Sequence, residues 1–205
     1  MYGQQAMSAN GDFIYTVVLD LQGINQSLYI GQRMKPAIKS LTISNSDITI
    51  GYEMWPKKLT DDTIQPAVDD WLNPARKKSV IQKYGPIQYW DTSQVQYMNS
   101  LFVTKKSFND DISRWNTNNV TDMDQMFLNT PFNQNIGKWN TNKVTDMDLM
   151  FLNTPFNQDI GKWNTRLVTD MTAMFAGAES FNHPLKSWNT NKVKSMNFMF
   201  SYAKS

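Results

Sequence analysis

The sequence predicts an α+β repeat solenoid with 24–25 residues per turn, preceded by a helical cap and a small antiparallel β unit. Tryptophans recur in the second half at spacings of 25, 24, 24 and 25 residues, namely at Trp90, Trp115, Trp139, Trp163 and Trp188. Each opens the phrase W-[ND]-T-x-x-V, and a methionine follows three residues after each valine. A period of this length is typical of stacked repeats. We therefore expect a β unit at 1–58, a cap at 60–86 and a solenoid at 87–205.

Residues 12–55 contain four runs rich in β-branched and aromatic residues, namely FIYTVVLDL, SLYIG, KSLTIS and DITIGYEM. Glycine, asparagine and serine separate these runs, so we expect four short antiparallel strands. A unit of this size buries little apolar surface by itself. We therefore expect it to pack on the cap helices or on another chain.

Residues 60–86 predict two short helices, at about 64–72 and 74–84. Pro66 and Pro74 exclude one long helix, and Pro74 suits the first position of the second helix with Asn73 as its N-cap. Gly85 followed by proline ends that helix. The apolar side chains of this segment should cover the open end of the first coil, as terminal caps do in solenoids.

Each repeat continues from its tryptophan with the pattern V-x-x-M-x-x-M-F. This pattern favours a short strand followed by one or two helical turns, with helices beginning near Thr121 and Thr145. A second strand is expected near the next tryptophan, for example at 159–163. Strands of successive turns would pair in parallel at about 4.8 Å. The tryptophan, methionine and phenylalanine columns predict the core, and a methionine-rich ligand surface is the alternative.

The residue inventory argues against catalysis. The chain has no cysteine, which excludes thiol nucleophiles, thiolate metal sites and disulfides. Its one histidine, His183, occupies a repeat position where the other copies carry Asp110, Gln134 and Gln158. Neither a glycine-rich phosphate loop nor a cluster with metal-ligand spacing occurs. We predict a non-enzymatic protein without cofactor or metal.

Two charged columns and one end of the repeat are candidate surfaces. Asp122, Asp146 and Asp170 form a column that predicts helix caps, with calcium binding as the alternative. The basic column Arg114, Lys138 and Lys162 predicts either a solvated face or a contact with a carboxylate- or phosphate-rich partner. Together with the last, uncapped repeat, these bases give the candidate interaction surface: Arg114, Lys138, Lys162, Met196, Met199, Phe200, Tyr202 and Lys204.

Three segments carry a resemblance to a known family: WNTNNVTDMDQMF (115–127), FNQDIGKW (156–163) and the lead-in AVDDWLNPARKKSVIQKYGPIQYWDTSQV (67–95). They resemble the BspA-type leucine-rich-repeat surface proteins, which include many Mycoplasma lipoproteins and occur in protists, algae and large DNA viruses. The resemblance covers about 67–205. It implies a leucine-rich-repeat-like coil and a protein that binds other molecules rather than an enzyme.

We therefore expect a structural or scaffolding protein that makes protein–protein contacts, of which a minor component of a large virus particle is a specific form. The alternative is a surface adhesin or receptor-binding module that recognises a host protein or glycan. The first ten residues are polar without positive charge, and the longest apolar run, 13–19, is too short to span a membrane. We expect no membrane insertion, no nucleic-acid partner, and an intracellular or virion-associated location.

Overall fold

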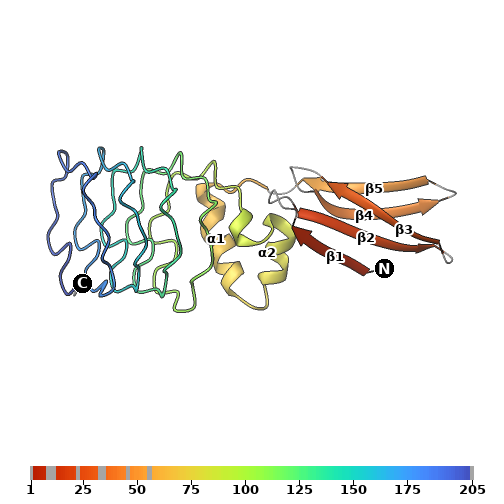
Figure 1. Cartoon of the computed structure of the whole chain (residues 1–205), viewed down its shortest axis with the longest axis horizontal. Coiled ribbons are helices and arrows are strands. Elements are labelled where there is room, and N and C mark those ends of the chain that lie inside the picture. The colour runs from red at the N-terminus through yellow and green to blue at the C-terminus, as the bar shows by residue number, and fades with distance from the viewer. Residues whose placement is uncertain are drawn as a thin grey trace. The chain divides into compact units, whose positions relative to one another are not determined.

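The computed structural model describes the backbone of residues 2–7, 13–21, 24–31, 36–44 and 47–54, and all of residues 57–203. The chain divides into two compact units, Met1–Trp55 and Pro56–Ser205, which are coloured red to orange and yellow to blue in Figure 1. Each unit is described here by itself. The division lies close to the end of the β unit expected at residue 58.

The first unit contains strands β1 (Tyr2–Met7), β2 (Phe13–Leu21), β3 (Ile24–Gly31), β4 (Pro36–Ser44) and β5 (Asp47–Met54). β1, β2 and β3 form one antiparallel sheet in that order, and β4 pairs with β5 in a second. The sequence predicted four strands and missed β1. Its YGQQAM run lacks the β-branched signal, so its extended conformation depends on pairing with β2.

The second unit begins with the helices α1 (Asp61–Leu72) and α2 (Lys77–Tyr84), followed by a 3-10 turn at Ile87–Tyr89. α1 starts earlier than the expected residue 64, because the Thr60 N–H donates to Thr63 Oγ1 at 2.9 Å and starts the helix there. Pro66 therefore lies inside α1, where it costs one backbone hydrogen bond without ending the helix.

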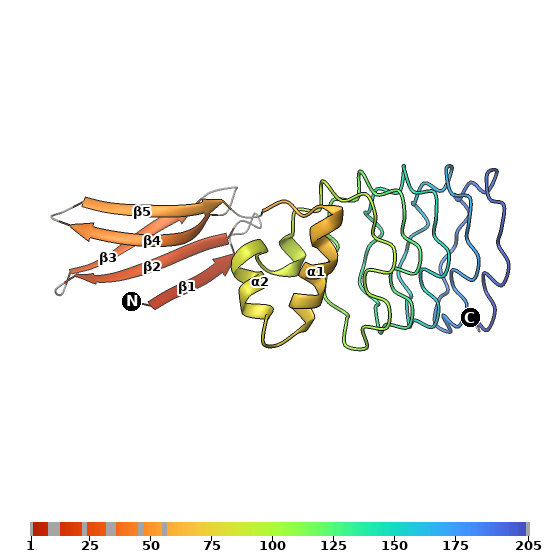
Figure 2. The same cartoon turned by 180° about the vertical axis from the view of Figure 1, so that it is seen from behind.

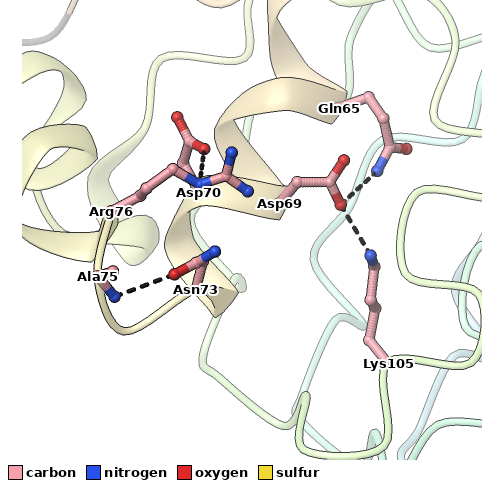
Figure 3. A network of polar contacts seen from close by, with 7 residues as sticks. All are labelled: Gln65, Asp69, Asp70, Asn73, Ala75, Arg76 and Lys105. Atoms are coloured by element: carbon pink, nitrogen blue, oxygen red, sulfur yellow. Dashed lines mark hydrogen bonds and ion pairs between the residues drawn. The ribbon is translucent and has the colours of Figure 1, made fainter.

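The N-cap predicted for the second helix is wrong. α2 begins at Lys77 with Arg76 as its N-cap, so Pro74 is not its first residue. Asn73 is instead the C-cap of α1, and its Oδ1 accepts the Ala75 N–H at 3.0 Å (Figure 3). The asparagine satisfies the connecting turn locally, which delays the second helix.

From Trp90 onward the chain winds into stacked coils, seen from two sides in Figures 1 and 2. We number them coil 1 (90–114), coil 2 (115–138), coil 3 (139–162), coil 4 (163–187) and coil 5 (188–203). Equivalent residues of neighbouring coils pair in parallel at one position, through Tyr97, Asp122, Asp146, Asp170 and Ser195. Within residues 57–203 no strand extends beyond such a single bridge.

Alternate backbone N–H groups join each coil to the next. Met123, Gln125, Phe127 and Asn129 donate to the carbonyls of Asp146, Asp148, Met150 and Leu152, at 2.8–3.1 Å. Gln125 and Asn129 have φ values of 56° and 57°. A left-handed residue at every fourth position breaks a right-handed helix, so this segment is a run of turns. The helical turns expected after Thr121 and Thr145 are therefore wrong.

The second predicted strand, at 159–163, is also a turn. Trp163 N donates to Ile160 O at 3.0 Å, and Gly161 N donates to Asp159 Oδ1 at 2.9 Å. The Asp159 side chain accepts the backbone N–H two residues further along, and this turn competes with an extended strand.

The predicted core is confirmed. The tryptophans of coils 1–4 and the methionine and phenylalanine columns behind them are buried. Phenylalanine rings stack from coil to coil, with 5.7 Å between Phe127 and Phe151 and 5.6 Å between Phe151 and Phe175. The indole N–H of Trp163 donates to the buried carbonyl of Ile136 at 3.2 Å. Burial of these methionines contradicts the methionine-rich ligand surface in coils 1–4.

Helix α1 packs against coil 1 through polar contacts. Gln65 Nε2 reaches Leu101 O at 3.5 Å, and the Trp71 indole N–H donates to Asp110 Oδ2 at 2.8 Å. Asp69 accepts Lys105 Nζ at 2.7 Å and also lies within hydrogen-bond distance of Gln65 (Figure 3). Polar side chains of α1 thus take the place that a preceding coil would occupy.

Candidate functional site

The aspartate column closes turns rather than capping helices. Oδ1 of Asp122 accepts the Asp124 N–H at 2.9 Å, Asp146 accepts Asp148 in the same way, and Asp170 accepts Thr172 at 2.8 Å. A side-chain oxygen that accepts the N–H two residues on defines an Asx turn. The predicted helix-capping role is therefore corrected, although the acids still satisfy the backbone.

A second acidic row, Asp124 and Asp148, lies two residues further along each coil. Oδ1 of both carboxyls is buried and has no hydrogen-bond partner among the described residues. Burial raises the pKa of Asp148 to about 6, and the carboxylates of Asp124, Asp170 and Asp146 add to that rise. Burial also raises the pKa of Asp124. The stacked carboxylates therefore oppose folding when they are charged.

This row predicts a pH-dependent stability. The folded pKa of Asp148, about 6, lies above its ordinary value of 3.8, so the folded protein takes up the proton first as pH falls. Through this group, the free energy of unfolding should increase as the pH falls from about 6 to about 4. Above pH 6 this contribution is absent. After allowance for solvent screening, a shift of this size corresponds to about 1–2 kcal/mol in the free energy of unfolding.

Urea unfolding of Asp148→Asn at pH 7.5 and pH 5 measures this contribution. We expect the variant to be the more stable protein at pH 7.5 and to change less between the two values. Asp62→Asn alters an exposed acid in the first turn of α1. Its free energy of unfolding should change between the two pH values as much as that of the parent chain. A parent-like slope for Asp148→Asn would refute the assignment.

The calcium alternative gains no support from the geometry. Residues 57–203 contain no group of three or more acidic or histidine side chains arranged to hold a metal ion. Backbone bridges instead place Asp122, Asp146 and Asp170 at equivalent positions of coils 2, 3 and 4. In coil 4, Thr172 replaces the acid of the second row, and its hydroxyl lies 2.6 Å from Ser195 Oγ.

His183 takes over a hydrogen bond that glutamine makes in coils 2 and 3. Its Nε2 lies 3.3 Å from Asn157 O, while Gln158 Nε2 donates to Asn133 O at 3.2 Å and Gln134 Nε2 to Asn109 O at 3.1 Å. The ring joins two coils, so its contacts account for the residue structurally.

The predicted basic row is exposed along its length. Arg114, Lys138 and Lys162 lie at the surface at equivalent positions of coils 1, 2 and 3. The Arg114 guanidinium lies over the Tyr89 ring, at 5.2 Å from its centroid. The ion pairs within residues 57–203 join Arg76 to Asp70 and Lys105 to Asp69, so they leave this row to solvent.

The end face of coil 5, formed by Met196, Phe198, Phe200 and Tyr202, exposes large apolar side chains. Their exposed fractions are 43 %, 74 %, 48 % and 82 %, respectively. Met199, predicted at this surface, is 5 % exposed and packs in the core. Lys204 lies outside the described residues. Phe198 was not predicted, although a phenylalanine where the other copies carry serine, glutamine, leucine and alanine was a usable signal.

The same four residues carry backbone donors without a backbone acceptor. Met196, Phe198, Phe200 and Tyr202 are equivalent to Met123, Gln125, Phe127 and Asn129, whose N–H groups bond to the next coil. Within the described part of the chain, no backbone carbonyl accepts from these four N–H groups. The end face thus combines apolar side chains with a row of like-directed donors.

Comparison with known proteins identifies one family. The model of the family described as "Mycoplasma protein of unknown function, DUF285" matches residues 75–155 and 130–205, which together are more than half of the chain. No curated protein and no solved structure matches the chain. Among the described residues, no helix has the length and apolar character needed to cross a membrane.

Proposed function

We propose, from the premise that this chain belongs to the DUF285 family of Mycoplasma proteins of unknown function, that its coils are leucine-rich-repeat-like units of the BspA type forming one solenoid. The agreement between period and geometry supports this assignment, because each copy of 24–25 residues makes one coil and pairs with its neighbours through an equivalent residue. Each copy cannot enclose a core alone, so neighbours must supply the rest.

The function that we propose is non-catalytic: a scaffold that makes protein–protein contacts, for which a large assembly such as a virus particle is one setting. The end face of coil 5 carries this proposal. An exposed row of four N–H groups is costly to cover unless acceptors replace water, and the apolar side chains beside it favour burial. A protein segment that offers carbonyls at alternate residues satisfies both requirements, as in strand addition to a sheet edge.

The direction of the N–H groups restricts what such a segment is. Two copies meeting end face to end face would oppose donors to donors, so neither row would gain an acceptor. A copy meeting it head to tail would have to displace α1, which already bonds to Leu101 O and to Asp110. A segment that covers this face must therefore present backbone carbonyls that are not already bonded to a helix such as α1. Either another coil or a docked protein can supply them.

Hydrogen exchange tests the proposal. We would compare the amides of residues 196, 198, 200 and 202 in the purified chain and in tagged complexes isolated from its native cells. Exchange should slow at least about tenfold in the complex, since protected amides open only with the contact. The amide of Gln125, already bonded to Asp148 O, serves as an internal control. Equal exchange at the end face in both samples would contradict the proposal.

The exposed basic row favours a second function, a surface adhesin or receptor-binding module that contacts an acidic host protein or glycan. Arg114, Lys138 and Lys162 present one positive charge per coil over three coils. Binding through them should weaken as salt increases. A monomeric chain whose host binding is lost when all three become glutamine, but not in Phe198→Asp, would favour the adhesin over the scaffold.

A further inference from the structure

We infer that an open hollow on the side of coils 1–3 binds a carboxylated sugar. The hollow encloses about 580 Å³ and is lined by Thr60, Ser93, Gln94, Gln96, Asn119, Thr121 and Lys143. This volume is in the range of small-ligand sites. Neither the end face nor the basic row contributes to it, so the inference goes beyond the proposed scaffold and does not rest on it.

The cation of the hollow is held in place by a relay of hydrogen bonds. Asn119 Nδ2 donates to the Ser93 carbonyl at 2.8 Å, and Asn119 Oδ1 accepts Lys143 Nζ at 2.7 Å. The ammonium therefore spans from coil 3 to coil 2 with its other N–H bonds available for a ligand. Because the amine is oriented before a ligand binds, binding costs less conformational entropy.

The remainder of the lining is neutral and hydrogen-bonding. Gln94 and Gln96 are exposed, and each side-chain amide offers donors and an acceptor. Thr121 Oγ1 donates to Gln96 O at 3.3 Å, and the hydroxyl oxygen can still accept a hydrogen bond. Such groups suit hydroxyls better than apolar side chains, which favours a sugar over a peptide.

The lining carries its one charged side chain, Lys143, at the coil 3 end, and Gln94 and Gln96 lie at the coil 1 end. At the end near coil 1, Asp61 Oδ1 accepts the N–H groups of Gln96 and Tyr97 at 2.7 and 3.0 Å. Lys143 belongs to coil 3, two coils further on, or about 10 Å at the spacing of paired parallel strands. We expect a bound sugar to direct its hydroxyls toward Gln94 and Gln96 and its carboxylate toward Lys143.

Titration by heteronuclear NMR tests the inference with defined probes. Sialyllactose and a hyaluronan tetrasaccharide represent sialic and uronic acids, and lactose is the neutral control. We expect dissociation constants of about 1 mM for a carboxylated probe, with shifts at Ser93, Gln96 and Asn119. Which probe binds more tightly distinguishes the two sources of the carboxylate.

Matched variants assign the binding to the hollow. Lys143→Met should weaken binding about tenfold, and Asn119→Ala about threefold because it frees the ammonium. Lys192→Met, which alters the exposed lysine at the equivalent position of coil 5, outside the hollow, should bind like the parent. Equal binding of lactose, parent-like binding by Lys143→Met, or no shifts with either acidic sugar would overturn the inference. So would a polyglutamate peptide that binds the hollow more tightly than both sugars.

Discussion

Replacing Phe151 by alanine should lower the free energy of unfolding by about 3–5 kcal/mol, the usual cost of a phenylalanine-sized cavity in a packed core. Phe151 is fully buried, and its ring lies 5.7 Å from Phe127, 5.6 Å from Phe175 and 4.0 Å from Phe156. One substitution therefore removes contacts within coil 3 and across both of its interfaces. Urea denaturation followed by tryptophan fluorescence measures the loss.

Phe198→Ala is the matched control. It makes the same chemical change in coil 5, but the side chain is 74 % exposed in the described structure. An exposed apolar residue contributes little, so the change should stay within about 0.5 kcal/mol. Comparable losses for the two variants would show that the phenylalanine column does not form the shared interior.

Replacing Leu149 by proline should cost at least about 3 kcal/mol, because proline fixes φ near −65° and removes a donor. Leu149 has φ of 53°, and its N–H donates to Thr172 O in the next coil at 2.9 Å. The variant loses both the left-handed conformation and one bond of the row that joins coils 3 and 4. Thermal unfolding followed by circular dichroism provides the measurement.

Leu149→Gly separates the backbone from the side chain at the same position. Glycine adopts positive φ without strain and keeps the N–H, and the Leu149 side chain is only partly buried. We expect a change of about 1 kcal/mol or less. If glycine destabilised the protein as strongly as proline, side-chain packing rather than the left-handed turn would hold this segment.

The periodic columns were readable because burial depends on the identity and spacing of side chains. Trp139 and Phe151 recur at the same place in every copy, and a side chain that meets its own equivalent in the next copy is removed from water on both sides. The positions of the exposed charges followed from the same period. The sequence therefore predicted which residues of coils 1–4 are core, and also where Lys138 and Lys162 reach the surface.

The local backbone could not be read in this way. Methionines and phenylalanines at helical spacing suit a helix and a run of turns equally, because both place them on one side. The choice depends on the N–H groups of Gln125 and Asn129, which bond to the next coil and hold both residues at positive φ. Asp122 adds the Asx turn that starts the segment. Local propensity favoured the helix that the coil-to-coil bonds exclude.

The sequence by itself determined the period, the buried columns of coils 1–4 and the family to which the chain belongs. Only the tertiary structure decided how each coil turns, because its hydrogen bonds join residues about 24 positions apart and no local pattern encodes them. For the same reason it alone buried the Oδ1 atoms of Asp124 and Asp148 without a hydrogen-bond partner among the described residues, and it alone turned Met199 inward. It also brought Thr60, Gln94 and Lys143 to one hollow.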